Sequence, residues 1–460
     1  MKNITRKKSK PVEAINIILS IMLLAMVLTW ILPCGDIVFS TGANGEYTAE
    51  YVRVDRSPVY PWHLPGLFVS SVSSSLTIIV LIVASEVMII AATKCGTIGA
   101  TIGGLSRRFK GNEKWLVIIF TLFFSILGIV IPPQCFIGFA GTFVYLMYTL
   151  GYDGILALAI VFLGSAQASV LSPVSTLVAL CQEVVGLPIY SGFVGRLISY
   201  VLFTIVSLLY FLRYAKRVKD DPSKSFLYGY YTNPVMGDLE NARPIKAIDY
   251  TVLLLIIGTF GVAVAGCTLW GWGVKDISAI ILVCGLLIGV ISRMTIKQIV
   301  RMIVEGLQET ASTIVIIIIA NTIGMILNTG NVVNTIIYYS ASALGKLPGI
   351  LIPAFLLLLC SALNFIIPSG SAKAVLLLPI ISPIGQLVGM TAQSTVMAYN
   401  YGDGFSNYIM PHDPGNASFL EATKIDYSRW VKFMMPLFWI WTSMAIIILT
   451  ILNHIGYGPF

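Results

Sequence analysis

Apolar stretches long enough to cross a lipid bilayer recur along the whole of this chain of 460 residues. They fall at 12–32, 66–93, 114–150, 154–185, 192–213, 248–271, 276–293, 306–328, 348–388, 391–421 and 433–453. Only 11% of the residues are charged, whereas a soluble domain carries about 25%. The pattern predicts an all-α polytopic membrane protein and excludes a soluble enzyme, a nucleic-acid-binding protein and a disordered scaffold.

Four of the stretches are too long for a single crossing and are interrupted by proline, glycine and polar residues: 114–150, 154–185, 348–388 and 391–421. Backbone at membrane depth must have its hydrogen bonds satisfied, unless it is buried in protein or lines a cavity. We therefore expect re-entrant hairpins in the first and third of these stretches. We expect broken helices in the second and fourth.

Landmarks of the first half of the chain return in the second half. Pro173 follows Pro132 by 41 residues, and Pro411 follows Pro368 by 43. Related halves with matching interruptions are typical of secondary transporters, whose binding sites lie at the interruptions. The spacing predicts two repeats.

The repeats and polar stretches divide the chain into five segments. We expect an N-terminal helix with an external loop at 1–65, a first repeat at 66–213, a cytoplasmic linker at 214–247, connecting and scaffold helices at 248–305, and a second repeat at 306–460.

Basic residues set the predicted topology, because cytoplasmic loops carry an excess of lysine and arginine. If the N-terminus is cytoplasmic and both hairpins enter and leave on one side, 23 of the 29 basic residues lie inside, 5 lie outside and Lys373 lies in the membrane. The first hairpin then opens to the cytoplasm and the second to the exterior. The two repeats would therefore be inverted.

The hairpin tips are the first candidate site. Helix ends at mid-membrane present free N–H groups that favour anions and free carbonyl groups that favour cations. The alternative to a ligand-binding tip at 368–371 is a kinked helix that packs against its neighbours through its small residues. The expected substrate ligands here and nearby are Pro132, Pro133, Gln134, Asn364, Ser369, Gly370, Ser371, Lys373, Asn407 and His412.

Asp403 is the strongest charged candidate. Glycine stands on both sides of it, which predicts an unwound helix, and a carboxylate near mid-membrane costs at least about 2.5 kcal/mol. It could hold a sodium ion, a proton or a cationic group of the substrate, or it could form a structural salt bridge with Lys373. Lys373 could instead bind a substrate carboxylate.

Other polar residues near the breaks could take part in cation coupling. His412 and Asp413 could form a proton relay or cap a helix, and Glu86 could be functional or form a polar helix contact. The expected cation-coupling residues are Asp403, Ser172, Ser175, Ser406 and Asp413. No cofactor is expected, and the only metal would be a coupled sodium ion.

Three segments resemble the YfcC-type branch of the four-carbon dicarboxylate anaerobic carrier family, within the ion transporter superfamily. They are Val185–Gly192 with Arg196, Pro368–Ala374, and Gly402–Asn407 followed by Lys424–Tyr427. The resemblance covers most of the chain in order. It implies an inverted-repeat, elevator-type carrier that forms a homodimer in the cytoplasmic membrane of a prokaryote.

The sequence departs from the family pattern at two breaks. Relatives usually read Pro-Thr-Ser-Gly where this chain has Pro411–Gly415, and they carry asparagine near the break where it has Ser172–Ser175. Both breaks contribute to the site that the resemblance implies, so the substrate does not follow from it.

The resemblance implies dicarboxylates and, in related branches, basic amino acids as the classes of substrate. We expect a cation-coupled symporter or an exchanger of a small carboxylate-bearing solute, an amino acid or a dicarboxylate, and the alternative is a basic amino acid antiporter, such as an arginine/ornithine exchanger. A channel would need a continuous pore, and a membrane enzyme would need a nucleophile with its base. The segments show neither pattern.

Overall fold

The computed structural model describes residues 12–41, 47–229, 243–344, 351–367, 370–387 and 389–458. Nearly all elements within these residues are helices. Seven helical segments are long and apolar enough to cross a membrane: Pro61–Lys94, Gly154–Leu171, Phe193–Asp220, Ala247–Trp270, Val274–Ile291, Ile296–Thr329 and Tyr427–His454. The predicted class of helical, multi-pass membrane protein is confirmed.

The N-terminal region contains the only strands in the described residues. Its elements are α1 (Val12–Ile31), β1 (Gly35–Thr41), β2 (Tyr47–Arg53) and the short 3-10 helix η1 (Pro61–His63). The strands pair antiparallel, with Gly35 opposite Arg53 and Thr41 opposite Tyr47. The sequence pattern predicted a loop here and missed the strands, although both are rich in the β-branched and aromatic residues that favour them.

A first series of helices follows. It comprises α2 (Leu64–Lys94), α3 (Thr97–Arg108), α4 (Lys114–Gly128), η2 (Pro133–Phe136), α5 (Ile137–Thr149), α6 (Gly154–Leu158), the π-helical turn η3 (Ala159–Leu163), α7 (Gly164–Leu171), α8 (Thr176–Val184), α9 (Phe193–Asp220) and η4 (Pro222–Lys224). The interruptions predicted in 114–150 and 154–185 are present, at η2 and between α7 and α8.

Two connecting helices lead to a second series. The connecting helices are α10 (Ala247–Trp270) and α11 (Val274–Ile291). The second series comprises α12 (Ile296–Thr329), α13 (Val333–Leu344), α14 (Ile352–Ile366), α15 (Gly370–Leu387), α16 (Ala392–Asn407), α17 (Pro414–Thr423) and α18 (Tyr427–His454).

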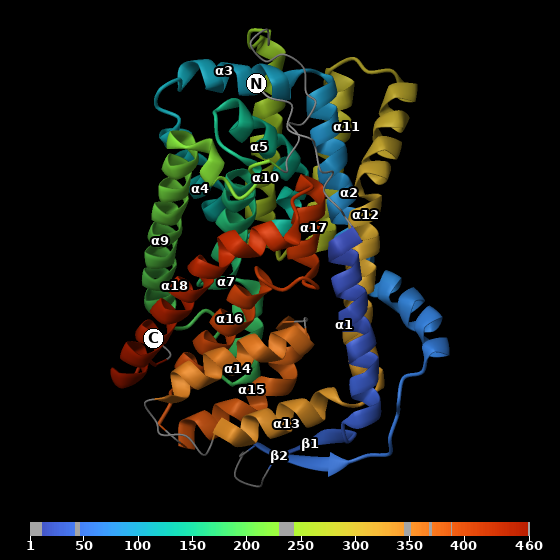
Figure 1. The fold of residues 1–460 in the computed structure, drawn as a ribbon, viewed down its shortest axis with the longest axis vertical. Helices are drawn as coiled ribbons and strands as arrows, with labels where there is room; N and C mark the ends of the chain where they lie inside the picture. Colours follow the sequence, from blue (N-terminus) through green and yellow to red (C-terminus); the bar gives the residue numbers. More distant parts are fainter. Residues whose placement is uncertain are drawn as a thin grey trace.

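The long helices run along the length of the molecule, and shorter helices lie at its two ends (Figure 1). Helix α2 packs against α11 and α12, and α1 packs against α12. Helix α3 lies at one end of the long axis, whereas α13 and the strand pair lie at the opposite end. Helices α14 and α15 lie near the α13 end, beside α16.

The outer helices expose large apolar side chains. Leu254 on α10 is 72% exposed, Val290 on α11 is 62% exposed, and Ile451 on α18 is 56% exposed. Water would make such extensive apolar exposure unfavourable, whereas lipid chains solvate it. The surface therefore agrees with a protein surrounded by a bilayer.

Asp153 holds the start of α6 to α9. Its carboxylate accepts hydrogen bonds from the Leu156 N–H (3.0 Å), the Ser225 hydroxyl (2.5 Å) and the Tyr214 hydroxyl. We expect Asp153→Ala to lower the free energy of unfolding by about 2–4 kcal/mol, because it removes a helix cap and leaves buried hydroxyl groups without their acceptor. Unfolding in detergent measures this loss. Asp153→Asn, which keeps a capping oxygen, should cost less, and the reverse order would contradict the assignment.

Candidate functional site

A buried ion pair joins the first turn of α15 to the last turns of α16. The Lys373 ammonium (Nζ) lies 2.7 Å from Oδ1 of Asp403, and the two side chains are 0% and 4% exposed. A lone charge in such surroundings would be strongly unfavourable, and each group offsets the charge of the other. The salt bridge expected as one alternative for these two residues is therefore present in the structure.

One asparagine side chain connects this ion pair to α14. Lys373 donates a hydrogen bond to Oδ1 of Asn364 (2.8 Å). The Asn364 amide nitrogen lies 3.0 Å from the Asp403 carbonyl oxygen, 2.9 Å from the Ser406 hydroxyl and 2.5 Å from Oδ1 of Asn407. Five of the predicted site residues are thus brought together where α14, α15 and α16 meet.

The start of α15 approaches the Asp403 carboxylate closely. A Cβ atom on Gly370 would lie 2.9 Å from Oδ2 of Asp403, so a larger residue there would displace this carboxylate or the start of α15. The Tyr399 hydroxyl donates to the Gly370 carbonyl oxygen (2.5 Å). The positive end of the helix dipole favours a carboxylate at this position. Ser371 is exposed, and Ser369 lies outside the described residues, as does Pro368.

The prediction that glycines unwind the helix at Asp403 is wrong. Helix α16 continues through Asp403 and ends only at Asn407. A Cβ on Gly402 would lie 2.4 Å from the Leu357 carbonyl oxygen, and one on Gly404 would lie 2.3 Å from Cγ1 of Val170. These glycines therefore let neighbouring helices approach α16, and tertiary packing outweighs their low helix propensity.

The break itself lies between α16 and α17. Asp413 caps α17, with Oδ1 accepting from the Asn416 N–H (2.7 Å). His412 is fully buried, and its ring centroid lies 5.2 Å from that of Phe365. A Cβ on Gly415 would lie 3.7 Å from the side-chain nitrogen of Gln134. Gln134, in η2, therefore reaches the second break, far away in sequence.

The serines of the first break accept hydrogen bonds from nearby backbone N–H groups. Ser172 accepts a hydrogen bond from the Val174 N–H (3.0 Å), and Ser175 caps α8 by accepting from the Val178 N–H (3.2 Å). Within the described ranges, no hydrogen bond joins either serine to Asp403. Pro132 and Pro133 are half-buried at the start of η2.

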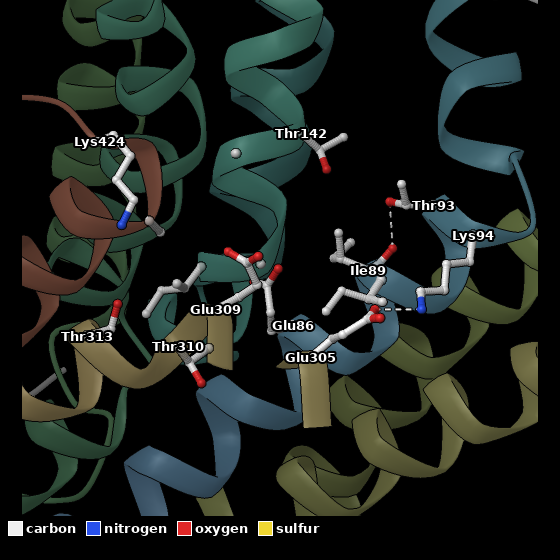
Figure 2. A pocket seen from close by; sticks show the side chains of 15 residues that line it. Glu86, Ile89, Thr93, Lys94, Thr142, Glu305, Glu309, Thr310, Thr313 and Lys424 are labelled. Carbon is white, nitrogen blue, oxygen red and sulfur yellow. Dashed lines mark hydrogen bonds and ion pairs between the residues drawn. The ribbon is translucent and has the colours of Figure 1, made fainter. Parts of the chain in front are cut away.

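A cavity of about 430 Å³ lies between α2 and α12 on one side and α5 and α17 on the other. Its polar lining includes Glu86, Thr142, Glu309, Thr310, Thr313 and Lys424 (Figure 2). Glu86 and Glu309 lie within electrostatic range of each other. At the edge of the cavity, Glu305 pairs with Lys94 (2.5 Å). Two neighbouring carboxylates with no ion-paired cation among the described residues favour a positively charged occupant.

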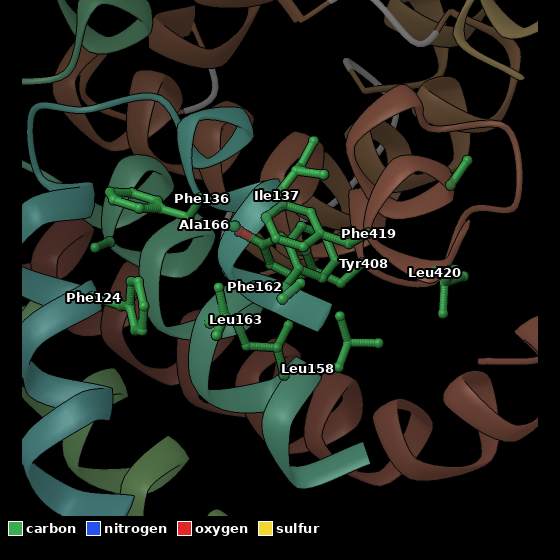
Figure 3. Close-up of a cluster of buried hydrophobic side chains, with 14 of the residues drawn as sticks. Phe124, Phe136, Ile137, Leu158, Phe162, Leu163, Ala166, Tyr408, Phe419 and Leu420 are labelled. Carbon is green, nitrogen blue, oxygen red and sulfur yellow. The ribbon is translucent and has the colours of Figure 1, made fainter. Parts of the chain in front are cut away.

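Aromatic side chains hold the second break against the first series of helices (Figure 3). The Phe162 ring stacks on Phe419, with centroids 4.5 Å apart, and meets Tyr408 edge-on at 5.5 Å. Phe124 meets Phe136 edge-on at 5.3 Å. Tyr408, at the end of α16, and Phe419, in the middle of α17, therefore pack against Phe162 of η3.

Glu309 is a site candidate that the sequence pattern did not single out. The signal was available, because Glu309 is an acidic residue inside the apolar stretch 306–328, and such residues are functional candidates. Tyr399 was also missed. Its hydrogen bond to Gly370 depends on the contact between α15 and α16, which the sequence pattern does not reveal.

Two solved transporter structures show low similarity to this fold. The YdaH transporter of Alcanivorax borkumensis has a TM-score of 0.48 and 16% sequence identity, with 97% of this chain and 99% of that chain covered. MtrF of Neisseria gonorrhoeae, from a class of antimetabolite efflux pumps, has a TM-score of 0.47 and 14% identity, with 95% and 94% covered.

Two relatives and one family match the sequence. The "Putative basic amino acid antiporter YfcC" of Escherichia coli is 28% identical over 374 residues, which cover 77% of this chain and 73% of the relative. An uncharacterized protein of Haemophilus influenzae is 25% identical over 477 residues, covering 92% and 93%. The sequence model of the C4-dicarboxylate anaerobic carriers matches residues 13–454. Because that match spans nearly the whole chain, the protein belongs to the C4-dicarboxylate anaerobic carrier family, whose members are membrane transporters rather than enzymes.

Proposed function

We propose that this protein is a secondary active transporter of a small carboxylate-bearing solute, an amino acid or a dicarboxylate, in the cytoplasmic membrane of a prokaryote. The buried Lys373–Asp403 pair carries the proposal. A solute carboxylate can replace Asp403 at the Lys373 ammonium. A solute amine, a sodium ion or a proton can replace Lys373 at Asp403. When both replacements occur together, each supplies a charge of the same sign as the group it displaces, so neither Lys373 nor Asp403 is left as a lone buried charge.

The order of elements supports two inverted repeats, α2–α9 and α12–α18. Helices α3 and α13 have 12 residues each, α4 and α14 have 15 each, and α9 and α18 have 28 each. Each pair occupies the same place in its series. Helices α3 and α13 lie at opposite ends of the molecule (Figure 1), as expected for repeats that enter the membrane from opposite sides.

The short helices support re-entrant hairpins. Helices α4 and α14, with 15 residues each, would extend about 22 Å, less than the roughly 30 Å of the hydrocarbon core. In the proposed arrangement, α4 with α5 and α14 with α15 enter the membrane and return on the same side. Their tips would bring Gln134 and Lys373 to the solute, with Asn407 and His412 nearby.

An elevator mechanism follows from this arrangement. We assign α2 and α12, with α1 and α11, to a fixed scaffold, and the helices of the hairpins and breaks to a moving body. The cavity between α2, α12, α5 and α17 lies at the boundary of these two bodies and would give the solute access. Scaffold contacts between two copies would form the proposed homodimer. Asp403, Ser406, Asp413 and the serines of the first break remain the proposed cation-coupling residues.

Exchange of basic amino acids is the second candidate function. The neighbouring carboxylates of Glu86 and Glu309 in the cavity suit a cationic solute, and the relative from Escherichia coli carries a name of this kind. Neutral or anionic solutes would gain less from these two groups.

Binding and transport assays test the proposed function. A thermal-shift screen of amino acids and dicarboxylates, with and without sodium, should find a solute that raises the melting temperature, because a ligand of the folded state stabilises it. Uptake of that solute into proteoliposomes should saturate and should be faster when the same solute is loaded inside. Flux that never saturates would instead favour a channel, and the absence of both binding and uptake would contradict the proposal.

A further inference from the structure

Arg196 is a fully buried arginine whose charge is not balanced by any described neighbour. It is the fourth residue of α9, and its side chain is 0% exposed. None of its three side-chain nitrogens has a hydrogen-bond partner in the part of the chain that the structure describes. A guanidinium carries five N–H donors and stays protonated. Burying all five without an acceptor is strongly unfavourable, so this arrangement requires an explanation.

The ionisable groups near Arg196 provide no negative charge. Cys181, Tyr401 and Tyr457 are the ionisable groups within electrostatic range, and all three are neutral in their ordinary state at pH 7. None of the ion pairs formed by the described residues includes Arg196. These residues therefore supply no counter-charge, and an anion from outside would supply it.

Side-chain amide and hydroxyl groups surround the backbone of Ser191 and Gly192, which precede α9. The Gln182 amide donates to the Ser191 carbonyl oxygen (2.8 Å), and the Gln393 amide donates to the Ser191 hydroxyl (3.2 Å). A Cβ on Gly192 would lie 2.1 Å from the Gln393 side-chain nitrogen and 2.4 Å from the Tyr457 hydroxyl. The backbone before Arg196 is thus packed against hydrogen-bonding groups from α8, α16 and the C-terminal end of the chain.

The equivalent position in the second series has no such imbalance. Trp430 is the fourth residue of α18 and is also fully buried. Its single donor, the indole N–H, bonds to the Tyr408 carbonyl oxygen (2.8 Å). Trp430 thus fills the fourth position of α18 with its donor satisfied, whereas Arg196 fills the fourth position of α9 with its charge unbalanced. We infer that Arg196 does more than fill space at this helix contact.

Cys181 lies between Arg196 and the Lys373–Asp403 pair in the network of electrostatic contacts. The Cys181 side chain is within electrostatic range of both Arg196 and Asp403, and that of Cys360 is within range of both Asp403 and Lys373. The charges of Lys373 and Asp403 cancel, so the three groups Arg196, Lys373 and Asp403 carry one net positive charge, that of Arg196. A solute at this pair could reach Arg196 with a second polar group.

We propose that Arg196 binds a carboxylate of the transported solute, at a position distinct from Lys373. This inference rests on the proposed transport function. The planar guanidinium can donate two parallel hydrogen bonds to a carboxylate, which a lysine ammonium cannot reproduce. The stability lost by burying an unpaired arginine is then recovered when the solute binds.

Succinate and succinamate, in which an amide replaces one carboxylate, test this assignment in the full-length protein. We expect wild type to bind succinate about 30-fold or more tightly than succinamate, because one bond to a charged group is lost. In Arg196→Gln the affinities for succinate and succinamate should differ by less than about threefold. In Arg196→Lys the ratio of the two affinities should lie between those of wild type and Arg196→Gln. Competition for solute uptake in proteoliposomes and thermal shifts both report these ratios.

The stability of the empty protein separates a binding role from a structural one. Without solute, Arg196→Gln should melt at the same temperature as wild type or higher, because it removes an unpaired buried charge. Arg213→Gln, on the exposed side of the same helix, is the matched control and should leave both the ratio and the melting temperature unchanged. An unstable Arg196→Gln protein that keeps the wild-type ratio would overturn the inference.

The remaining outcomes distinguish this inference from the proposed function. If wild type transports L-arginine but not succinate, then L-arginine binding and uptake that are unchanged in Arg196→Gln would contradict the role of Arg196 alone. Wild type that neither binds nor transports either compound would contradict both.

Discussion

Asp403→Asn is expected to abolish coupled transport and to destabilise the protein by about 3–5 kcal/mol. The substitution leaves the Lys373 ammonium, which is 0% exposed, without its counter-charge, and breaking one partner of a buried pair has a cost of this size. Lys373→Met should have a similar effect, because it leaves the Asp403 carboxylate unpaired. Uptake in proteoliposomes and unfolding in detergent measure the two losses separately.

The double variant Lys373→Met with Asp403→Asn separates stability from function. Neither position 373 nor position 403 then carries an unpaired charge, so the double variant should recover much of the lost stability. Transport should remain absent because neither exchange partner is present. Lys224→Met is a matched control, because its ion pair with Asp221 is largely exposed, and we expect no measurable change. Transport and cation dependence that survive in Asp403→Asn would remove this carboxylate from the mechanism.

Gly402→Ala is expected to reduce transport by about 100-fold and stability by about 1–3 kcal/mol. The added Cβ would lie 2.4 Å from the Leu357 carbonyl oxygen and 2.7 Å from Cβ of Cys360, so α14 and α16 must move apart. Asn364 on α14 would then lose its bonds to Asp403 and its neighbours. A displacement of about 1 Å at a functional site can cost this much activity.

Gly258→Ala is the matched control for this prediction. Gly258 lies in α10, and a Cβ added there would have no described atom within 4 Å, so alanine should be neutral or should add up to about 1 kcal/mol of stability. Melting temperature and uptake rate should be measured for both variants. If Gly402→Ala behaved like Gly258→Ala, close packing at α16 would not control the site.

Several features of the site were predictable from the sequence because they depend on local composition. Charged residues in apolar stretches identified Lys373 and Asp403, and proline and glycine identified the interruption at η2. The inverted orientation of the repeats and the domain boundaries remain predictions. The hydrogen-bond partners of Ser172 and Ser175 could not be predicted from the sequence. A serine near a break can cap a helix or face a ligand, and this depends on the groups that surround it.

The sequence by itself determined that this chain is a multi-pass helical membrane protein, since the solvent of each segment follows from its hydrophobicity and length. The tertiary structure decided which charged groups meet. Asn364, Lys373 and Asp403 lie on three helices whose approach depends on Gly370 and Gly402. The same packing left Arg196 buried without a counter-charge among the described residues. Hydrophobic patterns place segments in lipid, whereas contacts between segments depend on shape complementarity over a few ångströms, which no local pattern encodes.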